Sequence, residues 1–259
     1  MQTATDRMDP ARAQALCATL GLSARPAEGD PLPPFFHQVH FWDAHPPEAL
    51  GRDGHPRLGG PIPDLGLPRR MWAGGRLEIA APLCAGIPAE RITDLEKAER
   101  KQGRSGPLGF VTLRHEVRQT GRLCLTEWQE LVYREQAGKG AAPAPPEAPL
   151  HADHRESMAF DSTLLFRYSA LTFNGHRIHY DADYARGVEG YAAPVVHGPL
   201  LAQLLALLAE KRLGRLTRFA FRATAPLTLG EAAELCWRDD GTLWVTGPEN
   251  RQCMLARAG

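Results

Sequence analysis

The sequence lacks any run of about 18 apolar residues, which is the length that a membrane-spanning helix needs. The segment 1–22 carries acidic side chains and lacks the apolar stretch of a secretory signal peptide. We therefore expect a soluble, cytoplasmic protein with no membrane partner.

A surplus of either charge is also missing, because 30 Lys and Arg residues balance 30 Asp and Glu residues. Proteins that coat nucleic acids need a basic surplus, so we expect no nucleic-acid partner. The five cysteines are scattered without a Cys-x-x-Cys pair, which argues against a disulfide framework and a zinc site. The segments GRDG and GRSG lack the spacing of a dinucleotide-binding loop, so we expect neither a metal nor an organic cofactor.

The 259 residues, of which 43% are apolar, suit two modules of about 110 to 130 residues each. A helix is predicted over residues 9–20, before a Pro- and Gly-rich stretch whose aromatic residues indicate an ordered cover. Alternation of apolar and polar residues then predicts an antiparallel meander. Its strands are expected at residues 76–83, 91–101, 108–119 and 122–135.

The second half repeats this plan with clearer signals. The segment 163–173 is predicted as a strand, and 199–213 as a helix that is apolar on most faces and therefore buried. Four strand-like runs follow the helix, at residues 218–227, 231–239, 242–248 and 251–258.

A long buried helix followed by an antiparallel sheet that can wrap it is the plan of the hotdog fold. The first half has the strands but no equally long helix, so we predict an α+β double hotdog with a degenerate first module. The modules are expected at residues 1–140 and 158–259, joined by a linker at 141–157 that is rich in Pro and Ala.

The residues with catalytic chemistry lie between the predicted strand 163–173 and the buried helix. His179 follows Asn174 and His176 in a loop, and its imidazole can donate and accept protons near neutral pH. Gly198 stands at the start of the helix, where unpaired N–H groups and the helix dipole favour an oxyanion. A base and an oxyanion hole together are the minimum needed to add water to an α,β-unsaturated thioester.

The segments NGHRIH and VVHG resemble the fingerprint of the MaoC-like, R-specific enoyl-CoA hydratases and dehydratases, which have the hotdog fold. The resemblance implies that His179 is the catalytic histidine and that Gly198 supplies the oxyanion-hole N–H. Asn174 stands where that family usually has a catalytic aspartate. Because an amide does not take up a proton, Asn174 would orient water or substrate, and His179 would act as the sole acid and base.

A more specific resemblance, to a tandem-hotdog subgroup with a MaoC-type N-terminal domain, covers most of the chain. It includes the segments DGHPRLGGPIP, PRRMWAGGRLE and FRYSALTFNGHRIHYDADYA. The subgroup contains itaconyl-CoA hydratases, mesaconyl-C4-CoA hydratases and mitochondrial 3-hydroxyacyl-thioester dehydratases. The resemblance implies that the first module has lost catalysis and shapes the acyl-CoA tunnel.

Six further residues are candidates for substrate binding. Arg69, Arg70 and Arg177 could pair with a CoA phosphate or with a second carboxylate of the substrate, although solvated surface charge is the simpler interpretation. His176, His197 and Trp72 complete the set; His197 could instead serve only a local carbonyl group. Asp181 and Asp183 could supply the carboxylate that is missing at residue 174, but we expect them to cap the following short helix.

These features favour an acyl-CoA hydratase that converts itaconyl-CoA or mesaconyl-C4-CoA to citramalyl-CoA. The alternative is a dehydratase of 3-hydroxyacyl thioesters on CoA or acyl carrier protein. A thioesterase would need a carboxylate base on the central helix, where Glu210 is the only acid and lies far along it. A non-catalytic acyl-CoA-binding protein is the last alternative. The expected assembly is a monomeric tandem or a homodimer, with the acyl-CoA substrate as its ligand.

Overall fold

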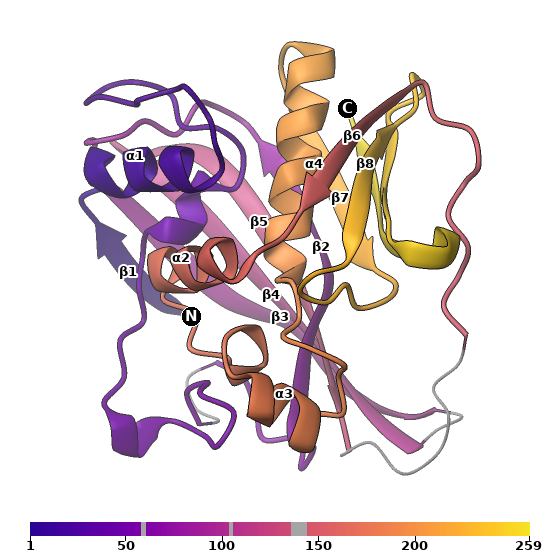
Figure 1. Ribbon diagram of the computed structural model, residues 1–259. Helices are drawn as coiled ribbons and strands as arrows, with labels where there is room; N and C mark the ends of the chain where they lie inside the picture. Colours follow the sequence, from indigo (N-terminus) through magenta and orange to yellow (C-terminus); the bar gives the residue numbers. More distant parts are fainter. Residues whose placement is uncertain (58–60, 104–105, 136–143) are drawn as a thin grey trace.

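Ten strands form one continuous antiparallel sheet in the computed structural model (Figure 1), which describes residues 1–57, 61–103, 106–135 and 144–259. The strands follow the order β1-β3-β4-β5-β2-β7-β10-β9-β8-β6, so the five strands of the first half lie on one side and the five of the second half on the other. No helix of the described residues is long and apolar enough to cross a membrane.

The first half supplies a strongly curved meander, and its predicted strands are confirmed. Its strands are β1 (Gln2–Asp6), β2 (Arg69–Ile79), β3 (Ala89–Gly103), β4 (Gly106–Gln119) and β5 (Arg122–Arg134). In β4, buried and partly exposed residues alternate along most of the strand, because successive side chains point to opposite faces. The predicted first helix is α1 (Pro10–Thr19), where the side chain of Asp9 accepts a hydrogen bond from the Ala11 N–H.

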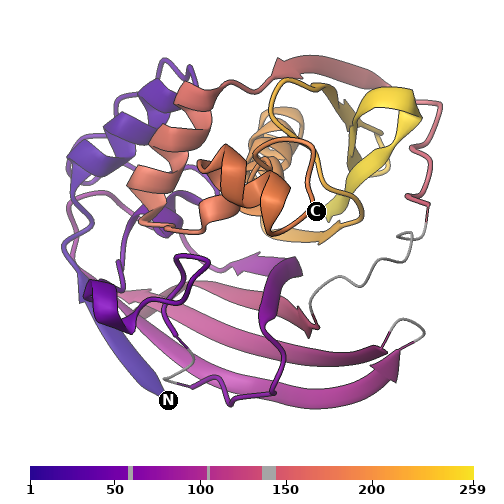
Figure 2. The same ribbon diagram turned by 60° about the horizontal axis from the view of Figure 1, so that its bottom comes forward.

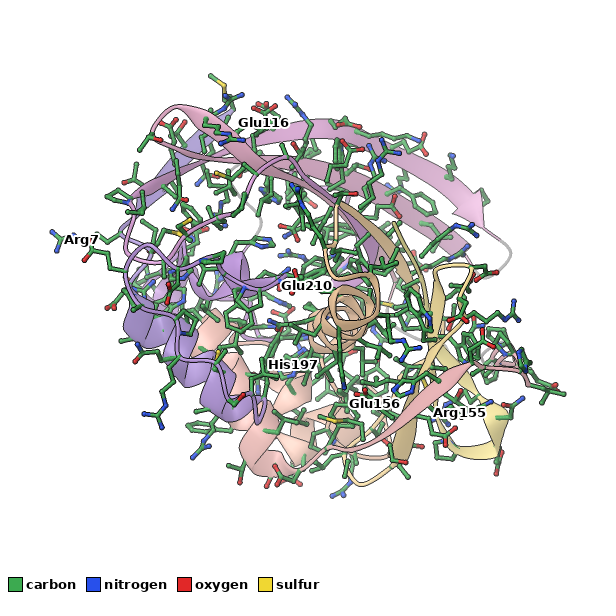
Figure 3. The ribbon with its side chains drawn as sticks, turned by 90° about the horizontal axis from the view of Figure 1, so that it is seen from above. Arg7, Glu116, Arg155, Glu156, His197 and Glu210 are labelled. Carbon is green, nitrogen blue, oxygen red and sulfur yellow. The ribbon has the colours of Figure 1, made fainter. Side chains whose placement is uncertain are left out.

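The second half wraps its strands around one long helix. Its strands are β6 (His154–Ala159), β7 (Arg218–Ala223), β8 (Ala232–Trp237), β9 (Thr242–Thr246) and β10 (Gln252–Ala258). The helix α4 (Gly198–Leu213) confirms the prediction for residues 199–213, and it contacts β7, β8, β9 and β10 of its own half and β2 of the first half. Figures 2 and 3 show the sheet curving around this helix, as expected of a hotdog.

The segment 163–173 is a helix, so the prediction of a strand there was wrong. The helix α2 (Ser162–Thr172) begins at Asp161, whose side chain accepts a hydrogen bond of 2.7 Å from the Leu164 N–H. Leu165, Tyr168 and Ser169 are buried, and this spacing of three and four residues places them on one helix face. Beside α2 lies α1, as Figure 2 shows.

Shorter elements complete the chain: η1 (Phe36–Val39), η2 (Pro47–Ala49), η3 (Arg177–His179), α3 (Ala182–Gly187) and η4 (Pro248–Asn250). The end of the segment predicted as a linker belongs to β6, which pairs with β8. The residues 141–143 of that linker, with 136–140 before them, lie outside the described residues. Division of the chain at this segment stays a prediction.

The two halves join where β2 pairs with β7, and Gly75 lies opposite Phe221 at this junction. A Cβ atom on Gly75 would lie 2.5 Å from the Trp128 carbonyl oxygen on β5, so a larger residue would push neighbouring strands apart. The hydrophobic core continues across the junction. Phe35 of the first half, for example, packs edge to face against Phe219 of β7, with ring centroids 5.8 Å apart.

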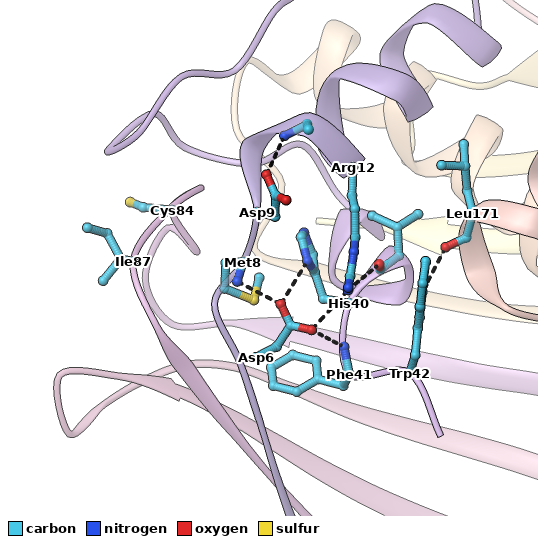
Figure 4. A network of polar contacts seen from close by, with 12 residues as sticks. Asp6, Met8, Asp9, Arg12, His40, Phe41, Trp42, Cys84, Ile87 and Leu171 are labelled. Carbon is cyan, nitrogen blue, oxygen red and sulfur yellow. Dashed lines mark hydrogen bonds and ion pairs between the residues drawn. The ribbon is translucent and has the colours of Figure 1, made fainter. Parts of the chain in front are cut away.

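The carboxylate of Asp6, at the end of β1, holds the loop around residues 40–42 next to β1 and α1 (Figure 4). Asp6 accepts hydrogen bonds from the His40 Nδ1, from the backbone N–H groups of Met8 and Phe41, and from the Arg12 guanidinium. Burial raises the pKa of Asp6, but the hydrogen bonds outweigh this effect and hold the pKa below its ordinary value. Trp42, the next residue, donates to the Leu171 carbonyl oxygen and so connects the same loop to α2.

Candidate active site

One cavity of about 1750 Å³ opens between the two halves of the molecule, and residues of both halves line it. Seven of the nine site residues expected from the sequence line this cavity: Asn174, His176, His179, Gly198, Arg69, Arg70 and Trp72. The other two, Arg177 and His197, do not line it.

His179 ends the short helix η3 and is oriented by a backbone carbonyl group. Its Nδ1 lies 2.7 Å from the Val195 carbonyl oxygen, which only accepts hydrogen bonds, so Nδ1 carries the proton. The lone pair is therefore on Nε2. Burial lowers the pKa of His179 to about 4, although the bond to Val195 opposes this effect. At neutral pH the ring is thus an uncharged base.

His197 lies against His179 and brings the base to the beginning of α4. The two imidazole rings are stacked, with centroids 3.7 Å apart and planes 19° apart. His197 is fully buried, and its Nε2 lies 2.8 Å from the Ser169 hydroxyl oxygen on α2. Figure 3 looks along α4 with His197 labelled. His197 is buried and does not line the cavity, so the structure does not bring it to a substrate.

The N-terminus of α4 faces the cavity at Gly198. No side chain caps this end of the helix, and Pro199 has no N–H group of its own. The Gly198 N–H belongs to the first turn, where no preceding turn of helix supplies an acceptor. The helix dipole adds partial positive charge at the same place. This end of α4 can therefore stabilise negative charge on a thioester oxygen in the cavity.

Asn174 shapes the loop that carries His179. Its Oδ1 accepts a hydrogen bond of 3.0 Å from the His176 N–H, and its own N–H donates to the Ser169 carbonyl oxygen. Its Nδ2 makes no hydrogen bond to another residue that the structure describes, and the side chain lines the cavity. The ring of His176 lies edge to face against His179, with centroids 5.4 Å apart, and burial lowers the pKa of His176 to about 2.

The three arginines have different surroundings. Arg69 is paired with Glu189 at 2.5 Å, and both side chains are mostly buried. Arg177 is paired with Asp181 at 2.6 Å outside the cavity lining, so the structure does not bring it to a substrate. Arg70 lines the cavity without an ion pair to any described residue, and its charge helps to lower the pKa of His55 and of His176.

Asp181 and Asp183 lie at the N-terminus of α3. Asp181 caps α3, because its side chain accepts a hydrogen bond from the Tyr184 N–H, and Asp183 lies in the first turn. Both residues therefore lie where a capping role was predicted. Trp72 lines the cavity, and its indole N–H donates to the Gly74 carbonyl oxygen.

Sequence reasoning missed a carboxylate and an imidazole that the first half brings to the loop of Asn174. The Nδ1 of His55 donates to the Asp53 Oδ2 at 3.1 Å, and the His55 ring centroid lies 4.3 Å from that of His176. Donor atoms of Asp53, His55 and His176 lie within 4.8 Å of one another, a spacing that a metal ion could bridge. Because the Asp53 carboxylate already binds His55, the arrangement is that of a hydrogen-bonded pair. The Asp-x-His spacing in a Gly- and Pro-rich loop was the signal available.

A second group of polar residues lines the part of the cavity formed by the first half. Glu127 is buried and accepts hydrogen bonds from His37, Gln38 and Gln129. Burial raises the pKa of Glu127, but the surrounding histidines and hydrogen bonds outweigh this effect and lower it to about 2. His115 lies nearby and bonds to Thr93. The first half therefore adds ionised and polar groups to the cavity wall.

The fold and this site define a class, the double-hotdog hydratases and dehydratases. A model of the family described as "Hydroxyacyl-thioester dehydratase type 2" matches residues 35–229, and the chain belongs to this family.

Known proteins of several organisms are similar to this chain. It is 46% identical over 252 residues to the mesaconyl-C(4)-CoA hydratase of Chloroflexus aurantiacus, covering 94% of this chain and 90% of that protein. A MaoC-like dehydratase from Phytophthora capsici superposes with a TM-score of 0.72 at 14% identity, covering 100% of this chain and 95% of that one. A Mycobacterium tuberculosis protein with a double hotdog fold gives a TM-score of 0.51 at 18% identity, with 74% of each chain covered. The predicted family and the predicted α+β double hotdog are thus confirmed.

Proposed function

We propose that this protein is an acyl-CoA hydratase that adds water to mesaconyl-C4-CoA and so forms citramalyl-CoA. The observation that carries the proposal is the position of His179, an uncharged base that lies beside the uncapped N-terminus of α4 in one cavity. The 46% identity to a protein named as a mesaconyl-C(4)-CoA hydratase supports the same assignment.

The reaction begins with polarisation of the thioester. Its carbonyl oxygen accepts a hydrogen bond from the Gly198 N–H, which draws electrons away from the conjugated double bond. A water molecule held by the Asn174 amide and the His179 Nε2 attacks Cβ, and His179 takes its proton. The resulting enolate is stabilised at Gly198 and then gains a proton at Cα. An oxyanion donor of this kind contributes about 3 kcal/mol to transition-state stabilisation.

Arg70 favours a substrate with a free carboxylate. In mesaconyl-C4-CoA the carboxylate is attached to Cβ, the atom that water attacks, so its partner must lie close to the base. Arg70 lines the same cavity as His55 and His176, and its charge contributes to lowering the pKa of both histidines. Arginine suits this role because its planar guanidinium can bind a carboxylate through two hydrogen bonds.

The polar wall around Glu127 disfavours a long fatty acyl chain. Filling that part of the cavity with methylene groups would deprive buried polar groups of water, which is costly. A short dicarboxylyl group avoids this cost. Itaconyl-CoA attached at C4 has an unconjugated alkene, so its hydration requires a prior proton shift to the mesaconyl isomer.

The proposal needs no cofactor, because side chains and one backbone amide supply both proton transfer and charge stabilisation. We also propose a cytoplasmic location and an assembly that is either a monomeric tandem or a homodimer. Acyl-CoA is the proposed ligand.

The second candidate function is dehydration of 3-hydroxyacyl thioesters. The family description favours it, and the same groups would catalyse the reverse reaction.

The two candidate functions are tested by incubating the purified protein with mesaconyl-, itaconyl- and crotonyl-CoA, and separately with 3-hydroxyacyl thioesters. A product heavier by one water supports hydration of that substrate. Free thiol would indicate a thioesterase, and unchanged substrate in every case would contradict both candidates.

A further inference from the structure

We propose that Asp53 and His55 of the first half form a second acid–base pair of this active site. In this scheme His55 exchanges the proton at Cα of the thioester, while His179 exchanges the proton of water. The inference rests on the proposed hydratase function and replaces the expectation that His179 is the sole acid and base.

The loop that carries the pair is docked directly onto the loop of Asn174. The Arg177 N–H donates to the Asp53 carbonyl oxygen at 2.8 Å. Gly54 lies against Gly175 so closely that a Cβ atom on Gly54 would overlap the Gly175 carbonyl oxygen. Gly54 also has a φ of 85°, which favours glycine. The position of Asp53 and His55 is therefore fixed by backbone contacts with the catalytic loop.

The hydrogen bond within the pair sets the tautomer of His55. Because the Asp53 carboxylate accepts the proton of Nδ1, the other ring nitrogen, Nε2, is free to exchange a proton in the cavity. Asp53 also accepts a hydrogen bond from the His55 backbone N–H at 3.1 Å. A carboxylate in this position stabilises an imidazolium, whereas His179 has only a carbonyl partner.

Asp53 is the carboxylate that can replace the aspartate absent at residue 174. Among the described residues that line the cavity, the other carboxylates are Asp43, Glu127 and Glu189. Asp43 pairs with His45, Glu127 with His37 and Glu189 with Arg69. Asp53, by contrast, pairs with His55. The His55 ring lies next to that of His176, and the His176 ring lies next to that of His179.

Substrate binding would raise the pKa of His55 and so make the ring easier to protonate. Burial holds the pKa of His55 below its ordinary value, and the charge of Arg70 adds to this effect, while Asp53 opposes it. A substrate carboxylate paired with Arg70 would remove that contribution and raise the pKa of His55. The groups around the pair are Arg52, Arg70, His176 and His179 in the cavity lining, and Arg177, which does not line the cavity and donates to the Arg52 carbonyl oxygen.

Water and the enolate exchange protons with different histidines in the proposed step. An O–H bond of water breaks, its proton moves to the His179 Nε2, and the oxygen bonds to Cβ. The π electrons of the alkene move to the thioester oxygen at Gly198. The proton on His179 passes through cavity water or His176 to the His55 Nε2, and the enolate then takes it at Cα, which leaves both imidazoles uncharged as at the start. Neither an oxidant nor a reductant is involved.

Exchange of the Cα protons of citramalyl-CoA with D₂O tests whether His55 transfers the Cα proton while His179 transfers the proton of water. The wild-type protein should exchange them and hydrate mesaconyl-C4-CoA. His179→Ala should lose hydration but keep Cα exchange, whereas His55→Ala should lose both by about 100-fold, with KM changed by less than about threefold. Added imidazole should restore part of the rate of His55→Ala, and formate part of that of Asp53→Ala.

A matched control is the pair His151 and Asp153, which has the same spacing and a 3.1 Å hydrogen bond on the surface. His151→Ala and Asp153→Ala should match the wild type. If the wild type acts on no thioester, the proposed function itself fails. If the wild type is active, three results would overturn the inference: His55→Ala retains its rate, it loses the rate without rescue by imidazole, or His179→Ala loses Cα exchange. Loss of wild-type activity on chelation, with recovery on adding Zn²⁺, would also overturn it.

Discussion

The imidazole of His179 lies flat against that of His197, with ring centroids 3.7 Å apart. His197 directly precedes α4, so this contact places His179 beside the N-terminus of that helix. The stack thereby joins the loop that carries His179 to the start of α4. The stack also explains the buried His197, whose Nε2 is bound by Ser169 on a third segment.

Removal of the His179 imidazole should lower the rate of hydration more than removal of the Asn174 side-chain amide. His179→Ala should lower kcat for hydration by about 1000-fold, within the range of general base catalysis. Asn174→Ala should lower it only about tenfold, because it removes hydrogen bonds that orient water and not the proton acceptor. Steady-state loss of the enoyl absorbance measures both. Equal losses in the two variants would contradict the assigned roles.

The pH dependence of kcat/KM should show the buried state of His179. Burial lowers its pKa to about 4, so the basic form persists in acid well below the ordinary pKa of histidine. The rate should therefore fall as the pH drops through about 4. A profile measured with crotonyl-CoA, which has no free carboxylate, isolates this group from substrate ionisation. An acidic limb near pH 6.5 would show an ordinary, solvated imidazole.

Ser169→Ala tests the support behind the stacked rings. The substitution leaves the Nε2 of the fully buried His197 without its partner, which should reduce the free energy of unfolding by about 1–3 kcal/mol. The reduction in kcat should exceed any change in KM, because the base loses its orientation. Denaturant unfolding and kinetics measure the two effects, and Ser157→Ala on β6 is the control. An unchanged unfolding free energy would show that the hydrogen bond contributes little.

Arg70→Met should change the choice between substrates. A hydrogen bond to a charged group contributes about 1.5–3 kcal/mol, so kcat/KM for mesaconyl-C4-CoA should fall about 10- to 100-fold. The value for crotonyl-CoA should change little, since it has no carboxylate to lose. Arg118→Met, which alters a surface arginine paired with Glu116, is the control. Parallel losses for both substrates would place Arg70 at a part of the ligand that they share, such as a CoA phosphate.

Asp6 should make the stability of the fold depend on pH in acid. Its pKa in the folded protein lies below the ordinary value of 3.8, so ionisation of Asp6 stabilises the folded state above that pH. This contribution is lost as the pH falls below 3.8 toward the lower pKa of the folded protein. Asp6→Asn should therefore cost about 1–3 kcal/mol at pH 7 and progressively less in acid. Urea unfolding at several pH values measures the difference, and a cost independent of pH would contradict it.

Much of this site could be predicted because its signals are local. The helix over residues 199–213 is apolar on most faces, and Gly198 and His179 occupy recognisable places beside it. The helix α2 escaped prediction because its aromatic and Thr residues are typical of strands, while its capping residue, Asp161, lies just outside the apolar run. Arg177 could not be placed either, because its i,i+4 partner Asp181 binds it away from the cavity.

Asp53 and His55 could not be assigned to the site from the sequence for another reason. They belong to a loop far from His179 along the chain, and no periodic pattern records which loops touch. Their position follows from backbone contacts such as that between Gly54 and Gly175, which form only in the folded protein.

Pairing of β2 with β7 makes a single sheet out of the two halves of the chain. Either half produced alone would expose a strand edge with free backbone donors and acceptors, and such an edge recruits another strand. It would also hold only part of the catalytic apparatus, since the pocket takes residues from both sides of the junction. Co-expressed as separate polypeptides, the halves are therefore expected to recover hydration by complementing each other, while neither fragment would work by itself.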